Sequence, residues 1–169
     1  MAHLTKFLMQ DHARIFRAID ACAKDPNSLP TALAACSEIE AHMTIEEELV
    51  YTLLRDEIDG READESEADH DRARELIAQI RDLEPGDPAL SALMQQMQKE
   101  VGEHVDHEES SVLPRIHEHL LAREWDLGRI AFGMRQDLLG DSDRPKSLAA
   151  ARTVPNAGWT GGSVPNAGW

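Results

Sequence analysis

The chain has 169 residues, 41% of them hydrophobic, which is enough for one domain with a sizeable core. Its formal net charge of −15 and pI near 4.8 argue against binding to nucleic acid or to anionic membrane surfaces. No apolar run approaches the roughly 20 residues that span a bilayer, and the N-terminus lacks a signal-peptide pattern. We therefore expect a cytoplasmic protein without a nucleic-acid or membrane partner.

Clusters of Pro and Gly predict three chain reversals, at residues 26–30, 59–60 and 85–88. The four segments that they separate carry apolar residues at helical spacing, the pattern of helices with one face in a core. The sequence therefore predicts an all-α fold, an up-down-up-down four-helix bundle. Cys22 and Cys36 flank the first reversal, and we favour two reduced packing cysteines over a strained disulfide.

Each predicted helix carries one histidine in its apolar stripe. These four residues are His12, His42, His70 and His104. The midpoint of the first pair is residue 27 and that of the second pair is residue 87, each inside a predicted turn. Equal numbers of residues on both sides of a turn place antiparallel helices in register, at about 1.5 Å rise per residue. We therefore expect all four imidazoles at one height of the bundle.

Two of these histidines are followed four residues later by a glutamate, as His42/Glu46 and His104/Glu108. Residues four apart lie on the same helical face, so each pair offers a nitrogen and a carboxylate to the core. Buried carboxylates without partners cost several kcal/mol, a penalty that metal cations remove. A single such histidine more often satisfies its hydrogen bonds within the core. Six residues in register instead predict a two-metal site.

The two halves of this pattern resemble each other. Asp11-His12-Ala-Arg14 corresponds to Asp69-His70-Asp-Arg72, and both halves contain His-x-x-x-Glu-Glu. We interpret this as a duplicated helical hairpin with a pseudo-two-fold axis between the metals. Such a pair of hairpins suits two similar ions, each held by about two histidines and bridged by the two glutamates.

The ordered set resembles the hemerythrin HHE cation-binding family over residues 1 to about 140. The resemblance implies two iron ions, oxo- or hydroxo-bridged, with four terminal histidines and two bridging glutamates. By motif, these ligands are His12, His42, Glu46, His70, His104 and Glu108. It also implies a small diatomic or peroxide ligand, and mixed nitrogen and oxygen donors with open positions suit such ligands.

Arg74 stands where the oxygen carriers of this family have a fifth histidine. The set therefore resembles the family's branches linked to nitric oxide handling, peroxide breakdown or iron sensing. We expect binding or consumption of oxygen, peroxide or nitric oxide in oxidative or nitrosative stress defence. The alternatives are a non-catalytic module for iron or oxygen storage or sensing, and a structural bundle stabilised by zinc or another ion.

Four further side chains are candidates for an additional ligand. They are Glu47, Tyr51, His107 and Glu109. For Tyr51 an ordinary bundle tyrosine is the favoured interpretation. His107 lies off the ligand face and is expected at the surface, together with His3, His117 and His119.

Beyond Pro114 we expect a bend, and then a short extra helix from Arg115 to about Leu139. The predicted domains are the bundle, residues 1–140, and a segment with the composition of a flexible tail, residues 141–169.

The predicted tail contains a repeated hexapeptide, Val154–Trp159 and again Val164–Trp169. We interpret the two copies as docking peptides whose duplication raises avidity. Some hemerythrin-like proteins are cargo of encapsulin shells, loaded by C-terminal peptides that this tail resembles in position. An encapsulin shell is therefore the expected partner and an encapsulin nanocompartment the expected location. The alternative interpretations of the tail are a cloning remnant and a low-complexity segment whose sequence drifts. Whether the protein forms a homo-oligomer is left open.

Overall fold

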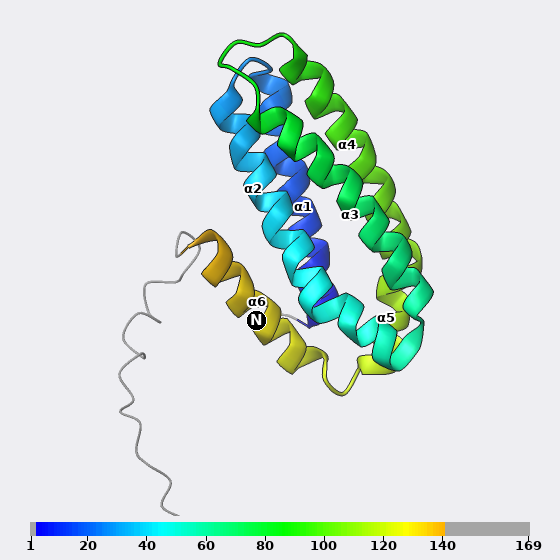
Figure 1. The fold of residues 1–169 in the computed structure, drawn as a ribbon. Helices are drawn as coiled ribbons and strands as arrows, with labels where there is room; N and C mark the ends of the chain where they lie inside the picture. The colour runs from blue at the N-terminus through cyan, green and yellow to red at the C-terminus, as the bar shows by residue number, and fades with distance from the viewer. Residues whose placement is uncertain (1–2, 141–169) are drawn as a thin grey trace, which may run out of the picture.

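A computed structural model describes residues 3–140 of the chain (Figure 1). In this part every regular element is helical, and the bounds are α1 Leu4–Lys24, α2 Leu29–Ile45, η1 Glu46–Tyr51, η2 Leu54–Ile58, α3 Gly60–Arg81, α4 Ala89–His107, η3 Glu108–Val112, α5 Leu113–Leu120 and α6 Glu124–Leu139. The elements η1, η2 and η3 are π-helical turns. The predicted tail, residues 141–169, and its two hexapeptides lie outside the described residues.

Four helical rods form the predicted up-down-up-down bundle, and this fold prediction is confirmed (Figure 1). The rods are α1, α2 with η1 and η2, α3, and α4 with η3 and α5. All three predicted turns lie between rods. The Ser28 hydroxyl caps α2 by accepting from the Thr31 amide, and the Asp59 carboxylate caps α3 by accepting from the Arg61 amide. Gly86 supplies a positive φ of 89° in the third turn.

The second and fourth rods widen into π-helical turns at equivalent places. Both η1 and η3 begin at the glutamate of a His-x-x-x-Glu motif, Glu46 in one rod and Glu108 in the other. A π-helical turn inserts a residue into the α-helical ladder and is frequent at functional sites. The side-chain pattern that predicted the helices contains no signal for this widening.

The bend that we expected at Pro114 is absent, and the fourth rod continues through this residue as α5. Pro114 lies in the first turn of α5, directly after η3, where a missing amide hydrogen is tolerated. The chain turns instead after Leu120, before the extra helix α6. In this helical stretch Leu120 and Leu127 are buried, whereas Leu121 and Ile130 are exposed.

The apolar core consists of two clusters separated by a layer of polar side chains. One cluster fills the end of the bundle near the first and third turns, from Ile15 and Ile19 to Val101 and Val105. The other fills the opposite end and includes Leu8, with residues of α5 and α6. The buried polar residues of the intervening layer are Asp11, His12, His42, Glu46, His70, His104 and Glu108. Polar groups placed there lose water, so they need partners.

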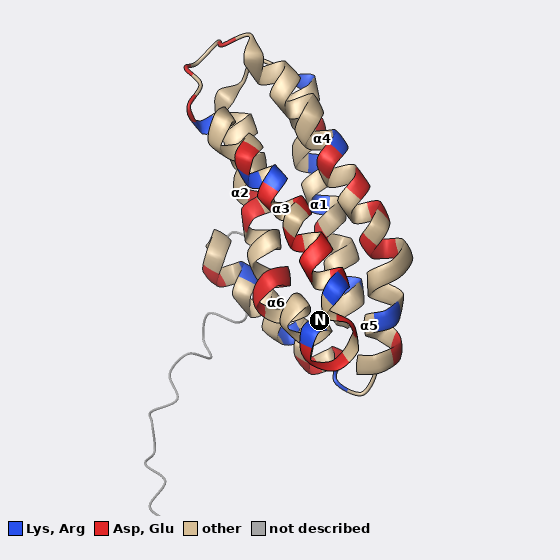
Figure 2. Ribbon diagram, turned by 45° about the vertical axis from the view of Figure 1, so that its right-hand side comes forward, with Lys and Arg blue, Asp and Glu red and all other residues tan. Residues whose placement is uncertain are grey.

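Helix α6 packs along α1 and α2 beside the bundle (Figure 1). Cys22 and Cys36 are buried free thiols, as expected. Acidic residues recur along the rods (Figure 2), in keeping with the net charge of −15. Within residues 3–140, no helix is long and apolar enough to cross a membrane.

Candidate metal centre

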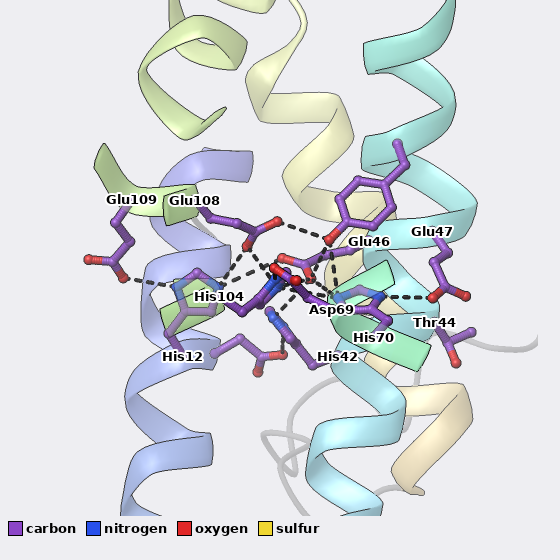
Figure 3. Close-up of polar contacts among 12 residues, drawn as sticks. His12, His42, Thr44, Glu46, Glu47, Asp69, His70, His104, Glu108 and Glu109 are labelled. Atoms are coloured by element: carbon purple, nitrogen blue, oxygen red, sulfur yellow. Dashed lines mark hydrogen bonds and ion pairs between the residues drawn. The ribbon is translucent and has the colours of Figure 1, made fainter. Parts of the chain in front are cut away.

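The structure brings all six residues that the sequence predicts as ligands into one buried layer (Figure 3). Their donor atoms form two overlapping groups, each compact enough for one cation, with atoms within 4.8 Å of one another. The first group is His12, His42, Glu46 and Glu108, and the second is Glu46, His70 and His104. Both glutamates are completely buried, and no histidine of the layer is more than 6% exposed.

In the first group the Nε2 atoms of two histidines face the two glutamates. His12 Nε2 lies 3.3 Å from Glu108 Oε2 and 3.7 Å from Glu46 Oε1, and His42 Nε2 lies 3.1 Å from Glu46 Oε2. The His42/Glu46 contact joins positions i and i+4, as the motif spacing predicts. The two imidazoles come from α1 and α2, which the first turn holds side by side.

The second group repeats this arrangement on α3 and α4. His70 Nε2 lies 3.3 Å from Glu46 Oε2 and 3.3 Å from His104 Nε2. His104 Nε2 lies 3.7 Å from Glu46 and 3.6 Å from Glu108. Both glutamates therefore reach histidines of the two halves, which is the geometry that bridging carboxylates need.

The nitrogen and oxygen atoms that face into the layer are better arranged to bind a cation than to hydrogen-bond with one another. His12 Nε2, His42 Nε2, Glu46 Oε1 and Glu108 Oε2 are buried and have no hydrogen-bond partner among the described residues. Buried polar atoms are rarely left without partners, so each such atom calls for an explanation. Imidazole nitrogens and carboxylate oxygens aimed at one point are a donor set for a transition metal. The residues present therefore fit the metal that the motif implies.

Each of the four histidines also has a carboxylate behind it, on its Nδ1 atom. The four pairs are His12 with Glu109 (2.9 Å), His42 with Asp11 (3.2 Å), His70 with Glu47 (2.8 Å) and His104 with Asp69 (3.5 Å). A hydrogen-bonded carboxylate at this position fixes the ring orientation and directs the other nitrogen toward a metal, as for His12, His42 and His70, whereas Asp69 contacts His104 without a hydrogen bond. Each half thus supplies one Asp and one Glu for this purpose, and we call these four residues the outer carboxylates.

Sequence reasoning missed the function of the outer carboxylates. Asp11 and Asp69 each precede the first histidine of a half, and Glu47 and Glu109 each follow the glutamate of the motif. These positions carry the same residue types in both halves, and that repetition was the available signal. Asp11 and Asp69 contact the second histidine of their own half, whereas Glu47 and Glu109 contact the first histidine of the other half.

The charges of the layer favour protonated His12 and His104 until a cation displaces the protons. Burial lowers the pKa of His12, but the neighbouring carboxylates of Glu108 and Glu46 outweigh it and raise the pKa to about 11. Burial likewise lowers the pKa of His104, whereas Glu108, Asp69 and Glu46 raise it to about 10. A metal ligand must be the neutral imidazole, so cation binding releases these protons and strengthens as the pH rises.

Tyr51 is fully buried and its hydroxyl reaches the same layer. The hydroxyl donates to Glu108 Oε1 at 3.0 Å, lies 3.1 Å from His70 Nε2 and lies 3.5 Å from Glu46 Oε2. Burial, followed by the charges of Glu46 and Glu108, raises its pKa well above 10. Tyr51 is therefore a neutral hydroxyl inside the polar layer.

The remaining candidates lie outside the layer. Glu47 and Glu109 contact histidine Nδ1 atoms, on the side away from the cation groups. His107 is partly buried, where we expected exposure, and it belongs to neither cation group. His3 is also partly buried, because its Nδ1 contacts Glu124 at 2.8 Å, whereas His117 and His119 are exposed as expected.

Arg74, at the position of the missing fifth histidine, points to Glu47, and its guanidinium lies 2.6 Å from both carboxylate oxygens. It supports an outer carboxylate and contributes nothing to either cation group.

Comparison with known proteins agrees with this geometry. The family described as hemerythrin HHE cation binding domain matches residues 3–116, a segment that contains all six layer residues. Searches of curated proteins and of solved structures gave no match. The match covers more than half of the chain and accounts for the buried histidine and glutamate cluster as a cation-binding site. This chain belongs to the hemerythrin HHE cation-binding family.

Proposed function

We propose that the layer holds two iron ions and that the protein binds or consumes oxygen, peroxide or nitric oxide in oxidative or nitrosative stress defence. The observation that carries this proposal is the convergence of four histidine Nε2 atoms on two shared, buried glutamates. The proposed ligands are His12, His42, Glu46, His70, His104 and Glu108.

The donor set supports iron over a structural zinc. Each ion would have two imidazoles and a share of two carboxylates, close to the two-histidine, one-carboxylate arrangement of non-haem iron sites. Structural zinc prefers closed tetrahedral sites that are rich in cysteine, and here both cysteines lie among apolar residues of the core. Six protein ligands shared by two ions leave coordination positions for exchangeable ligands. Iron bound there would supply one-electron chemistry.

A small cavity beside the layer supports a small ligand. It encloses about 20 Å³ next to His42, His70 and His104, and apolar residues such as Ile39, Ala73 and Val101 also line it. A water molecule needs roughly 10–15 Å³ of such space, so the cavity suits a molecule of two or a few atoms. An organic substrate would not fit it.

The position of the Tyr51 hydroxyl favours consumption of oxygen, peroxide or nitric oxide over storage of iron or oxygen. Its hydroxyl holds a proton beside Glu108 and His70. A positioned neutral hydroxyl can donate a hydrogen bond or a proton to a reduced oxygen species. Storage of iron alone would not require such a group.

The test is to load the protein with ferrous iron without oxygen and then to add peroxide or nitric oxide in separate experiments. Multiple turnovers with either oxidant would support the proposal. Binding without turnover would favour the storage or sensing alternative. A stable oxygen complex that reverses when oxygen is removed would contradict the proposed role in stress defence, because a carrier releases its oxygen unchanged.

A further inference from the structure

Arg135 is the one arginine buried within residues 3–140, with 6% of its surface exposed. It lies on α6, beyond the segment of residues 3–116 that the family match covers. A buried guanidinium is costly unless carboxylates pair with it. Its partners therefore indicate why it is there.

The contacts of Arg135 lead from α6 to the cation-binding layer. Its Nη1 atom lies 2.7 Å from Asp11 Oδ1, and its Nη2 atom pairs with Glu38 on α2. The other oxygen of the same aspartate, Asp11 Oδ2, lies 3.2 Å from His42 Nδ1. His42 Nε2 faces Glu46 at 3.1 Å. One fully buried carboxylate thus joins α6 to a histidine of the layer.

Within residues 3–140, no other outer carboxylate has a buried arginine behind it. Asp69 pairs with Arg72, whose side chain is 53% exposed, and Glu47 pairs with Arg74, whose side chain is 42% exposed. For Glu109, the described contacts include no arginine. Water screens exposed ion pairs strongly, whereas a buried pair is screened much less. The two halves of the site therefore differ at His42, whose outer carboxylate pairs with a buried arginine.

We propose that Arg135 is a positioning residue of the metal centre, which acts through Asp11 to fix the imidazole of His42. This rests on the proposed function, in which His42 ligates an ion. It makes α6 a part of the site, although α6 lies outside the matched domain. It also makes the two ion positions unequal, because the position served by His12 and His42 depends on α6.

Supporting this, two guanidiniums lie beside one oxygen of Asp11, and its other oxygen can orient the His42 ring with Nε2 toward the layer. Arg14 contacts the same oxygen as Arg135 but is partly exposed.

The test measures release of ferrous iron to a chelator, without oxygen, from the full-length protein. Arg135→Ala should accelerate the release of one of the two ions by about tenfold, the lower end of the effect expected for groups behind a ligand. Arg129→Ala is the matched control, since it removes an exposed arginine from the same helix α6, and it should leave both release rates almost unchanged. Glu38→Gln removes the other partner of Arg135 and should also leave them unchanged.

A double mutant separates positioning from simple anchoring of α6. If Arg135 acts through Asp11, then Arg135→Ala should add no further acceleration in an Asp11→Asn background. Arg135→Lys keeps the positive charge, so its release of iron should be slower than that of Arg135→Ala and closer to that of the wild type. If the alanine variant loses helicity, the lysine variant is used in its place. Equal release from the Arg135→Ala and Arg129→Ala proteins, or an undiminished effect in the Asp11→Asn background, would overturn the inference. Failure of the wild type to hold two ions would instead contradict the proposed function.

Discussion

At the scale of single residues, Glu46 occupies the centre of the site. Its carboxylate belongs to both cation groups and faces histidines on all four rods. Burial raises its pKa, but the charge of His42 and hydrogen bonds from the histidines hold it well below the usual value. The residue is therefore a buried anion whose charge the imidazoles or a cation must balance.

Replacing Glu46 with alanine should therefore reduce retention of both ions, because each loses a ligand and their shared bridge. Less than one ion per chain should remain after desalting, measured by metal analysis. Glu48→Ala is the matched control, since Glu48 is exposed two residues further along, and it should retain the wild-type content. Two tightly held ions in the Glu46→Ala protein would show that the bridging assignment is wrong.

Tyr51→Phe keeps the ring but removes the hydroxyl from the layer. This variant should bind as much iron as the wild type, because the tyrosine is a neutral hydrogen-bond donor there. Peroxide turnover should fall by roughly a hundredfold, the lower end for a lost proton donor. Tyr51 is the chain's one tyrosine, so alkaline titration of its absorbance also tests the raised pKa. Unchanged turnover would exclude a chemical role for the hydroxyl.

The six layer residues could be predicted because their signal is local and periodic. The four-residue spacing sets the helical face, and the turn positions set the register. The outer carboxylates could not be assigned in this way. Asp11 reaches His42 across an interhelical contact, and Glu47 reaches His70 between the two halves. Such contacts depend on side-chain rotamers and on the rotation of each helix, which the spacing leaves undetermined.

At the scale of elements, the π-helical turns and α6 distinguish the structure from the predicted bundle. The turns η1 and η3 begin at Glu46 and Glu108, and α5 continues the fourth rod where Pro114 predicted a bend. Proline disfavours a helix only where an amide hydrogen is needed, so its effect depends on the ladder before it. Helix α6 is joined to α1 near both of its ends, by Glu124 and by Arg135.

The Glu124 contact predicts a pH-dependent contribution to stability. Glu124 is fully buried and accepts from the Thr5 hydroxyl at 2.7 Å, with His3 and His117 at 2.8 and 3.0 Å. Burial raises its pKa, but the hydrogen bonds from these residues hold it below the usual 4.5. A carboxylate with a lowered pKa stabilises the fold above its unfolded-state pKa and loses this contribution as the pH falls through the folded-state value.

Glu124→Gln should therefore lower the free energy of unfolding by about 2 kcal/mol at neutral pH, since it weakens hydrogen bonds to a charged group. The difference from the wild type should shrink below about pH 4, when the wild-type carboxyl becomes protonated. Denaturant unfolding at several pH values measures this. Glu118→Gln, at an exposed position of α5, should have no such effect. A difference that stayed constant down to pH 2 would contradict the assignment.

At the scale of the whole molecule, the cation groups and both apolar clusters lie within residues 3–140. The family match ends earlier, at residue 116, so α6 and the repeated hexapeptides belong to the part of the chain beyond it. We propose that Val154–Trp159 and Val164–Trp169 dock the protein to an encapsulin shell. The support is the exact repeat, with an aromatic residue at the end of each copy.

Deleting residues 153–169 should accordingly leave iron content, helicity and thermal stability unchanged. Co-purification with a co-expressed encapsulin shell should be lost, as judged by size-exclusion chromatography and gels of the large fraction. Substituting Trp159 alone should weaken docking, and substituting Trp169 as well should abolish it, because two copies add avidity. Equal co-purification of the full-length and truncated proteins would remove the docking proposal.

The central claim is that one buried layer of four histidines and two glutamates holds two iron ions. Anaerobic titration of the full chain with ferrous iron, followed by metal analysis after desalting, tests it most directly. We predict two irons per chain, with protons released during binding because His12 and His104 start protonated. A plateau at one iron per chain would contradict it.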